Sequence, residues 1–317
     1  MIKLIATCVT IVTFSVTSLA CLNETHVLLN GKQIHGDRFT ADEMTPTGKD
    51  FAKLRDEYTI ELKKLDSLWK ATKNIEYYSD YGVVLVYLGR YAEAKDIFQE
   101  IEKTAPGRYA TAANLGTVYE LLGDNIQALH WIKKAVKIDP TSHDNSEWLH
   151  VKILEAKIKG DSYVTSDFLI ETNFGNDVKP ASSLDSLALL KLQEALFYQL
   201  NERVSFIKPK DKIVALLLFE LGNVYALTAD ITMSVRLYDM AKEYGYSSEV
   251  FEKRYTLFKS MHKNLSHVLP ESDESITYQP PILTEADTEN NYMTLGISLF
   301  CILAIVGWNA IRHHRNN

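Results

Sequence analysis

The sequence repeats itself at a spacing of 34 residues, and this periodicity limits the possible folds more than any other feature. Residues 75–108 align with residues 109–142 without a gap. The first block carries Tyr78, Tyr81-Gly82, Leu85, Gly89, Ala94, Phe98 and Pro106, and the same places in the second hold Ala112, Leu115-Gly116, Tyr119, Gly123, Ala128, Ile132 and Pro140. A third block at 215–248 matches less closely, through Leu218, Leu221-Gly222, Tyr225, Ser234, Tyr238 and Ala241.

Each block predicts two helices joined by a tight turn. In the first block, Gly82 leaves room for the second helix to approach at Ala94. Gly89 then ends the first helix, where a left-handed residue is needed, and Pro106 stops the second. This pattern resembles the tetratricopeptide repeat, a helix-turn-helix unit of the same length. The third block has Tyr246 in place of the proline, which leaves its link to a following helix open.

The resemblance implies an all-α fold in which tetratricopeptide-repeat helical hairpins stack in an α-solenoid, since each unit leaves an apolar face uncovered. Apolar spacing predicts further helices over 50–72, 146–159, 181–204 and 248–264. Residues 160–180 fit a short strand, a helix or a packed loop equally well. Asn30-Gly31 is a weak signal for a hairpin turn. We expect an N-terminal extension at 21–50 and a repeat domain at 51–264.

Residues 1–20 have the pattern of a secretory signal peptide. Lys3 supplies the positive start, an apolar stretch follows, and Ser18-Leu19-Ala20 is a small-x-small cleavage site. The mature chain would begin at Cys21. Two alternatives are lipoprotein processing at Cys21, which usually needs a large aliphatic residue where Ser18 stands, and an uncleaved anchor.

Residues 292–311 predict a C-terminal transmembrane helix, because this uncharged run of 20 residues would span about 30 Å. Tyr292 and Trp308 lie near its ends, where aromatic rings favour the headgroup layer. A buried core helix is the alternative, but the run ends against the basic tail 312–317. The linker 265–291 is acidic. The positive-inside rule therefore places the tail in the cytoplasm and residues 21–291 outside it.

The cysteines give no reason to expect a disulfide, and the overall charge gives none to expect nucleic acid as a partner. Cys8 leaves with the signal and Cys301 lies within the predicted membrane span, so neither is expected to pair with Cys21. The net charge of -7 gives no electrostatic reason to bind nucleic acid.

The sequence carries no complete catalytic or metal-binding motif, so we expect neither an enzyme nor a cofactor. His143 and His150, with Asp139 and Asp144 nearby, form a weak candidate metal site, and the favoured interpretation is surface polar residues after a helix stop. A phosphate-binding loop around Gly48-Lys49 lacks its other residues, and no GxSxG motif is present.

The resemblance also implies a concave groove, lined by the first helices of the repeats, that holds a peptide or a partner's helix. Carried over to matching positions, this groove comprises Ser79, Val83, Val86, Ala113, Asn114, Thr117, Glu120, Phe219 and Asn223. Asn114 stands where such repeats often carry an Asn that holds an extended backbone. A carboxylate clamp is not expected, because Ser79 and Val83 occupy the first-repeat positions of that variant.

We therefore expect a membrane-tethered extracytoplasmic protein that mediates protein–protein interaction or scaffolding in the cell envelope, periplasmic if bacterial. The alternative is a constitutive structural or accessory subunit of a membrane complex, with no exchangeable ligand. A third interpretation is a eukaryotic secretory-pathway membrane protein, since Asn23-Glu24-Thr25 and Asn264-Leu265-Ser266 are glycosylation sequons.

Overall fold

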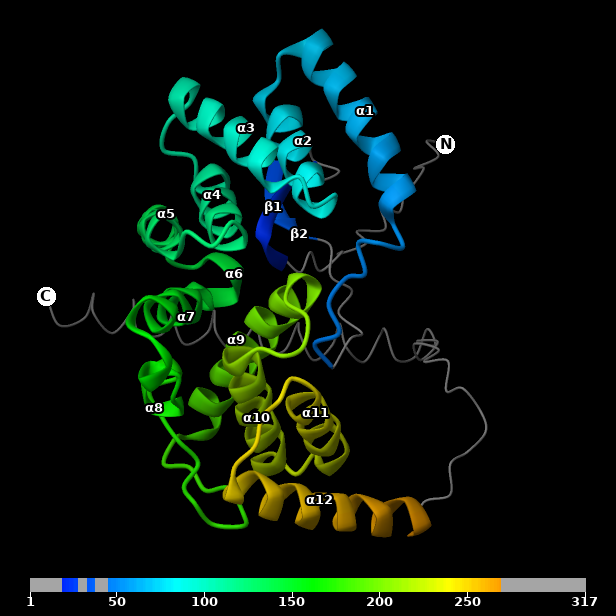
Figure 1. Cartoon of the computed structure of the whole chain (residues 1–317), viewed down its shortest axis with the longest axis vertical. Helices are drawn as coiled ribbons and strands as arrows, with labels where there is room; N and C mark the ends of the chain where they lie inside the picture. The colour runs from blue at the N-terminus through cyan, green and yellow to red at the C-terminus, as the bar shows by residue number, and fades with distance from the viewer. Residues whose placement is uncertain (1–18, 28–32, 38–44, 269–317) are drawn as a thin grey trace, which may run out of the picture. The chain divides into compact units, whose positions relative to one another are not determined.

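A computed structural model describes residues 19–27, 33–37 and 45–268 of the chain (Figure 1). Helices follow one another through the range 55–268. They are α1 (Arg55–Thr72), α2 (Ile75–Tyr87), α3 (Tyr91–Thr104), α4 (Tyr109–Leu121), α5 (Asn125–Ile138), α6 (Ser142–Asn145), α7 (Glu147–Lys159), α8 (Ser166–Leu169), α9 (Ser186–Phe206), α10 (Lys212–Leu227), α11 (Ile231–Glu243) and α12 (Glu249–Val268). The strands are β1 (Leu19–Val27) and β2 (Gln33–Asp37).

The helix boundaries confirm the 34-residue period. Helix α4 begins at Tyr109, 34 residues after Ile75 starts α2, and α5 begins at Asn125, the same distance after Tyr91 starts α3. The third pair, α10 and α11, lies at the predicted third block, although α10 starts earlier, behind the N-cap Asp211. The described helices thus support a tetratricopeptide-like α-solenoid.

Close helix contact at glycine is shared by all three pairs. A Cβ atom added to Gly82 would lie 2.7 Å from the ring of Phe98, and one added to Gly222 would lie 2.6 Å from the ring of Tyr238. Gly116 meets the side chain of Ile132 in the same way. Each large residue stands 16 positions after its glycine, so the third block has the packing of the other two.

The turns within the pairs also agree with the sequence. Gly89 is left-handed, with φ of 75°, and the N–H of Arg90 donates to the carbonyl of Leu85 at 2.9 Å, which satisfies the end of α2. In the third pair Ala229 takes the left-handed position, with φ of 65°. The third block does connect to a following helix: a short link after Tyr246 leads into α12, which packs on α11.

The supporting helices lie close to their predicted ranges, and the undecided segment now has a structure. Helix α1 ends at the predicted residue, Thr72, and α7 matches its predicted range within one residue. Between α7 and α9 the chain forms a 3-10 turn (Asp161–Tyr163), the short α8 and a loop. Residues 160–180 are therefore mostly a packed loop rather than a strand or a long helix.

The two strands add a small hairpin to the all-α framework. Strand β1 pairs antiparallel with β2, for example Val27 with Gln33 and Thr25 with His35, and the register shifts between Leu19 and Glu24. This pairing agrees with the predicted hairpin, whose turn at 28–32 lies outside the described residues. Helical periodicity could not reveal this element, because β1 packs against helices that are distant in sequence.

Two large apolar clusters hold the described helices together. The first joins β1 and helices α1 to α4, and it includes Leu22, Leu65, Val83 and Leu115. The second runs from α7 to α12. Two smaller clusters fill the space between them. One contains Ala112 and Ala135, and the other contains Ile132 and Leu154. The apolar clusters thus resemble the core of stacked repeats, in which each helix pair covers the apolar face of its neighbour.

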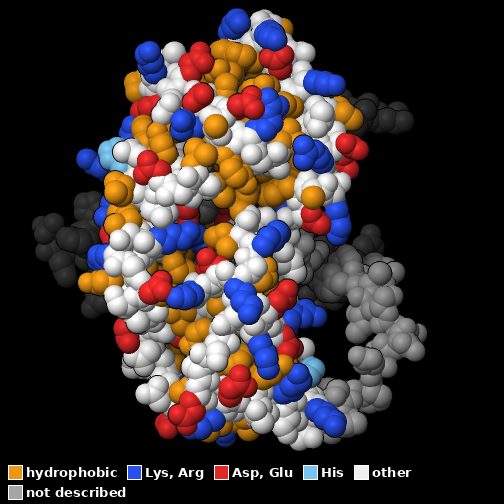
Figure 2. Space-filling model, in the orientation of Figure 1, with side chains coloured by type: hydrophobic (Ala, Val, Ile, Leu, Met, Phe, Trp, Pro, Cys, Tyr) orange, Lys and Arg blue, Asp and Glu red, His pale blue; other side chains and the backbone are white. Residues whose placement is uncertain are grey.

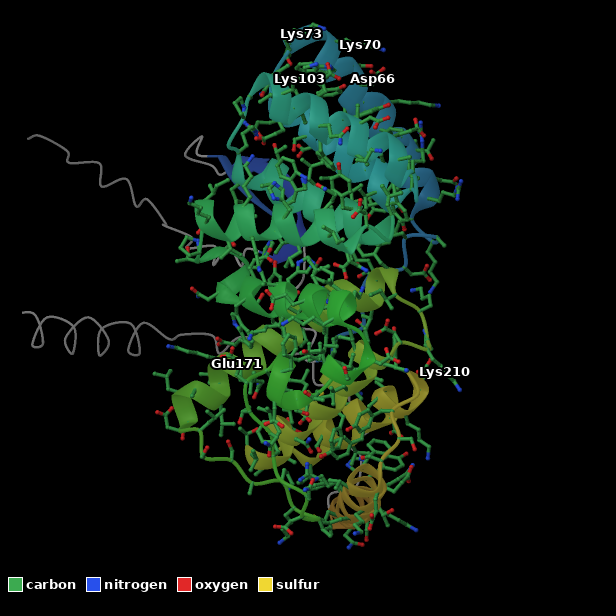
Figure 3. The ribbon with its side chains drawn as sticks, turned by 60° about the vertical axis from the view of Figure 1, so that its left-hand side comes forward. Asp66, Lys70, Lys73, Lys103, Glu171 and Lys210 are labelled. Carbon is green, nitrogen blue, oxygen red and sulfur yellow. The ribbon has the colours of Figure 1, made fainter. Side chains whose placement is uncertain are left out.

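The surface carries mixed charge. On the face shown in Figure 2, acidic and basic side chains are interspersed with apolar ones. Many of the charges pair locally, as Asp66 and Lys70 do on α1 at 2.7 Å (Figure 3). Such an arrangement offers no extended basic face on this side for nucleic acid.

The predicted terminal segments fall almost wholly outside the described residues. These are most of the signal peptide (1–18), the linker beyond Val268, the membrane span 292–311 and the tail 312–317. Leu19 and Ala20, the last two residues of the predicted signal, are the first two of β1. Within 55–268, no helix has both the length and the apolar character needed to cross a membrane.

Candidate protein-interaction groove

The predicted groove residues of the first two repeats lie together on α2 and α4, but they are not exposed. Their relative exposure ranges from 0% to 6% over Ser79, Val83, Val86, Ala113, Asn114 and Thr117. These six side chains are therefore covered in the folded chain. Their role in partner binding stays a prediction.

Strand β1 covers this face. It contacts α2 and α4, and also α6 and α9 (Figure 1). Leu22 of β1 is 1% exposed and belongs to the same apolar cluster as Val83 and Leu115. The concave face of the first two repeats is thus filled by the chain's own N-terminal strand, an arrangement that no periodicity in the sequence indicated.

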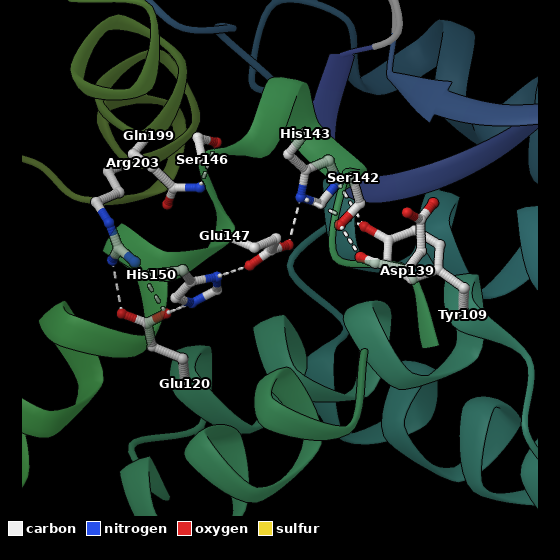
Figure 4. Close-up of polar contacts among 10 residues, drawn as sticks. All are labelled: Tyr109, Glu120, Asp139, Ser142, His143, Ser146, Glu147, His150, Gln199 and Arg203. Carbon is white, nitrogen blue, oxygen red and sulfur yellow. Dashed lines mark hydrogen bonds and ion pairs between the residues drawn. The ribbon is translucent and has the colours of Figure 1, made fainter. Parts of the chain in front are cut away.

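Glu120, the last predicted groove residue on α4, lies in a buried ion cluster (Figure 4). Its carboxylate accepts hydrogen bonds from His150 Nε2, Lys157 Nζ and Arg203 Nη1, each at 2.7 Å. Its side chain is 9% exposed and that of Arg203 is 5% exposed. Burial alone would raise the pKa of Glu120, but the charges of Arg203, Lys157 and His150 outweigh it and hold the pKa well below its usual value.

The cluster continues through α7 to α6. Glu147 pairs with His143 and, at 3.4 Å, with His150 Nδ1, while Tyr109 Oη lies 3.2 Å from His143 Nε2. Burial opposes the charged form of Glu147, yet the two histidines hold its pKa far below the usual value. Burial would lower the pKa of His150, and Glu120 and Glu147 reverse this and raise it.

These positions overturn the interpretation of His143 and His150 as surface residues. They are 4% and 1% exposed, because α6 and α7 turn the polar side chains inward, beneath α9. Across the described ranges, no group of three or more His, Cys, Asp and Glu side chains is arranged to hold a metal ion. The two histidines instead bind Glu147 of α7, and His150 also binds Glu120 of α4, which links α7 to the second repeat through ionic contacts.

A cavity of about 290 Å³ lies beside this cluster. Thr117 and Glu120 of the predicted groove line it, together with His150, Lys157 and Arg203. Tyr91 and Phe206 supply apolar walls. Two of the predicted groove residues thus border a cavity next to the ion cluster.

The third repeat forms a larger cavity, of about 630 Å³, between α10, α12 and the loop after α8. Phe219 lines this cavity and stacks on Tyr246, with ring centroids 4.6 Å apart. Burial raises the pKa of Glu220, which also lines it, although Ser166, Asn223 and Arg254 oppose the shift. The cavity thus combines an aromatic wall with a buried carboxyl group.

Asn223, the other predicted residue of the third repeat, is fully buried and organises its surroundings. Its Oδ1 accepts from Tyr238 Oη at 2.7 Å and from Arg254 Nη1 at 3.0 Å, and its Nδ2 donates to Glu220 at 2.8 Å. It acts inside the chain and is not available to hold a partner's backbone. Of the third-repeat pair, only Phe219 lines the cavity.

Two arginines that the sequence reasoning missed build these sites. Arg254 is 1% exposed and donates to the backbone carbonyls of Phe174, Gly175 and Asp177, which holds the loop over the third-repeat cavity. Arg203 binds Glu120 across the first cavity. Arg254 lies on a helix face with Phe251 and Phe258, which is a signal for a buried charge, whereas Arg203 lies among buried polar residues of α9 such as Gln199. The partner of neither arginine can be read from the sequence.

Comparison with known families supports the repeat assignment. A tetratricopeptide repeat model matches residues 110–142, which are almost the whole of the α4–α5 hairpin. No curated protein sequence matches the chain. Tetratricopeptide repeats generally mediate protein–protein interaction or scaffolding, and such domains are typically non-catalytic.

The chain therefore contains a tetratricopeptide repeat, and its described helices are consistent with a tetratricopeptide-repeat protein.

Proposed function

We propose that the chain is a membrane-tethered, extracytoplasmic tetratricopeptide-repeat protein that holds protein partners together in the cell envelope. The observation that carries the interaction role is the pair of helical hairpins at a 34-residue offset, of which the second matches the repeat family. The tether and its orientation rest on the sequence of the two ends: the signal-like residues 1–20, the apolar run 292–311 and the basic tail after it.

The third-repeat cavity is the proposed contact site for a partner, because β1 already fills the face of the first two repeats. Phe219 and Tyr246 offer an aromatic surface for a partner's apolar side chain. A photo-crosslinking residue at Tyr246 in the full-length protein should then capture a defined partner. The same residue at Ile60, which is 70% exposed on α1, is the control and should not. Equal capture at both positions would contradict this assignment.

The tether is tested in a Cys21→Ser background, because Cys21 would itself react outside the cytoplasm, by labelling introduced cysteines in intact cells with a membrane-impermeant thiol reagent. Ile126→Cys lies on α5 at a 68% exposed position and should react from outside. Asn316→Cys in the predicted tail should react only after the membrane is opened. Labelling of Asn316→Cys in intact cells would contradict the proposed orientation. If neither variant is labelled in intact cells, the proposed extracytoplasmic location of the repeats is wrong.

A constitutive accessory subunit remains the second candidate, and one observation favours it. Six predicted groove residues on α2 and α4 are covered within the chain, as expected if the repeats serve as a fixed scaffold without an exchangeable ligand. Gentle solubilisation followed by native mass measurement distinguishes the two. A fixed stoichiometry that survives dilution indicates a subunit, and a partner that dissociates on dilution indicates an exchangeable ligand.

A further inference from the structure

We propose that the third-repeat cavity is a pocket for a partner's lysine side chain, whose ammonium group pairs with Glu220 while its alkyl stem lies against Phe219 and Tyr246. This proposal deepens the proposed interaction function and rests on it. It names the chemical group by which a partner is held at this cavity, and the carboxylate on which that binding depends.

The first argument is the position of Glu220, which lines the cavity and is only 4% exposed. One carboxylate oxygen accepts from the hydroxyl of Ser166, and the other accepts from Nδ2 of Asn223 at 2.8 Å. Both donors are neutral. Within the described part of the chain, no lysine, arginine or histidine forms an ion pair with this carboxylate. A carboxylate buried in this way is costly to ionise unless a cation is brought to it.

The nearby Arg254 does not supply that cation. Its guanidinium donates to backbone carbonyls of the loop 174–177 and to Oδ1 of Asn223. These contacts use most of its N–H groups and hold it against the loop. Its charge favours the ionised form of Glu220, but only as a minor influence compared with burial. Glu220 therefore keeps the capacity to bind a charged donor that enters the cavity.

The second argument is the character of the walls. Phe219 and Tyr246 both line the cavity and stack on each other, with ring centroids 4.6 Å apart. Aromatic rings pack against the methylene groups of a lysine stem and attract its ammonium group through their faces. The ring of Phe219 already lies 5.7 Å from the guanidinium carbon of Arg254, measured to the ring centroid. The walls thus suit a side chain that is apolar along its length and cationic at its tip.

The charged residues that line the cavity also favour a cation. Asp161 and Asp167 stand at its exposed rim and Glu220 lies in its interior, whereas Lys212 and Arg254 are its basic residues. Lys212 pairs with Asp161, and both side chains are largely exposed, at 73% and 76%. The lining therefore carries more acidic than basic groups, which favours approach of a positively charged group.

The hydrogen bonds of Glu220 and the size of the cavity select lysine among cationic groups. An arginine binds a carboxylate best as a planar fork that needs both oxygens, but each oxygen of Glu220 already accepts one donor. An ammonium group needs only one free lone pair. The cavity, of about 630 Å³, exceeds what a single alkyl chain fills and leaves room for the partner's flanking backbone. The occupant is accordingly a lysine carried by a protein.

Binding of a cation here is coupled to the protonation of Glu220. Burial raises its pKa, and Asp167 adds to the rise, while the hydrogen bonds of Ser166 and Asn223 and the charge of Arg254 oppose it. Tyr238 and Tyr246 also face it, and burial raises the pKa of both, so they stay neutral. Because the ammonium group pairs with the ionised carboxylate, binding releases a proton from protonated Glu220. The affinity for lysine should therefore rise as the pH rises through the pKa of Glu220.

The test uses the full-length protein in detergent and the probe Nα-acetyl-lysine methylamide, followed by ligand-observed NMR titration. The comparison compound is Nα-acetyl-norleucine methylamide, which has a similar stem without the charge. We expect the lysine compound to bind about tenfold more tightly, because only it forms a charge-assisted hydrogen bond with Glu220. Glu220→Gln should remove this preference. Glu249→Gln, whose side chain is 83% exposed on α12, is the matched control and should keep it. Binding of the lysine compound should weaken as the pH is lowered.

Three results would overturn the proposal. The first is equal binding of the lysine and norleucine compounds to the wild type. The second is an unchanged preference in Glu220→Gln that is folded by its helical circular dichroism; if that variant does not fold, an unchanged affinity for the lysine compound in Tyr246→Leu has the same meaning. The third is tighter binding of 1,4-diaminobutane than of the lysine compound, which would make the occupant a small free amine.

Failure here is distinguishable from failure of the proposed interaction function. Capture of a defined partner at Tyr246 without any preference for lysine would overturn only the lysine pocket. Preference for lysine without capture of a partner would instead contradict the third-repeat cavity as a contact site for proteins.

Discussion

Removal of the Glu120 carboxylate tests whether the buried ion cluster holds α9 to the second repeat. In Glu120→Ala, three groups lose the carboxylate to which they are bound: Arg203, Lys157 and His150. Lys157 is 22% exposed, so its amine can turn toward water, and His150 can give up its proton. The guanidinium of Arg203, 5% exposed, cannot do either. The cost of the substitution should therefore arise mainly at Arg203.

The magnitude follows from burial. Removing one partner of a buried ion pair costs about 3–5 kcal/mol, because the other charge is left poorly compensated. Relaxation of Lys157 and His150 places the expected value for Glu120→Ala near the lower end, about 3 kcal/mol. For a domain of this size, such a loss lowers the unfolding temperature by about 6–12 °C.

The assay is thermal unfolding followed by helical circular dichroism, and the chain offers a matched control. The pair Lys133–Glu155 has the same 2.7 Å separation, but its side chains are 53% and 23% exposed. Glu155→Ala should cost about 0–1 kcal/mol, since exposed pairs are screened by water. In addition, Glu120→Ala combined with Arg203→Met should recover part of the loss, because the buried charge is then removed.

Equal destabilisation by Glu120→Ala and Glu155→Ala would refute this reasoning, because burial would then make no difference to the value of the ion pair. A double variant with Arg203→Met that is less stable than Glu120→Ala alone would refute the assignment of the cost to Arg203.

Three further predictions concern other parts of the fold. The pKa of His150 is raised in the folded state, so its stabilising contribution is complete below about pH 6.5 and is lost as the pH rises through the folded pKa. The variant His150→Gln should therefore flatten the alkaline side of the stability–pH curve, measured by urea unfolding. Gly116→Val should cost about 1–3 kcal/mol through overlap with Ile132, again in urea, and an unchanged midpoint would disprove the close helix contact. Arg254→Met should speed hydrogen exchange in the loop 174–177 at least tenfold while exchange in α2 stays constant, and protection of the loop in the variant would show that Arg254 does not hold it.

Much of the helical framework could be predicted because it depends on local pattern. Gly82 and Gly116 recur at the interval of the repeat, and Gly89 stands where only a left-handed residue ends the helix. The third pair was harder to recognise. Ala229 takes the left-handed position without a glycine, and the turn through Tyr246 replaces the proline stop.

For the groove residues, the local pattern predicted their position but not their exposure. The positions on α2 and α4 follow from the repeat and lie on one face, as predicted. Their exposure depends on whether another segment covers that face, and β1 is separated from them by more than 50 residues of chain. Likewise, the histidines at 143 and 150 follow a helix stop in the sequence, but the carboxylate that binds His150 comes from α4.

The amino-acid order alone determined which segments become helices and how neighbouring helices pair, because those choices depend on spacings of a few residues and on small side chains at contact points. Only the tertiary structure decided that β1 closes the face of the first two repeats, that Glu120 is neutralised by Arg203, and that Asn223 serves the interior. The physical reason is that burial and charge compensation are properties of segments brought together from distant parts of the chain, and no local pattern records which segments will meet.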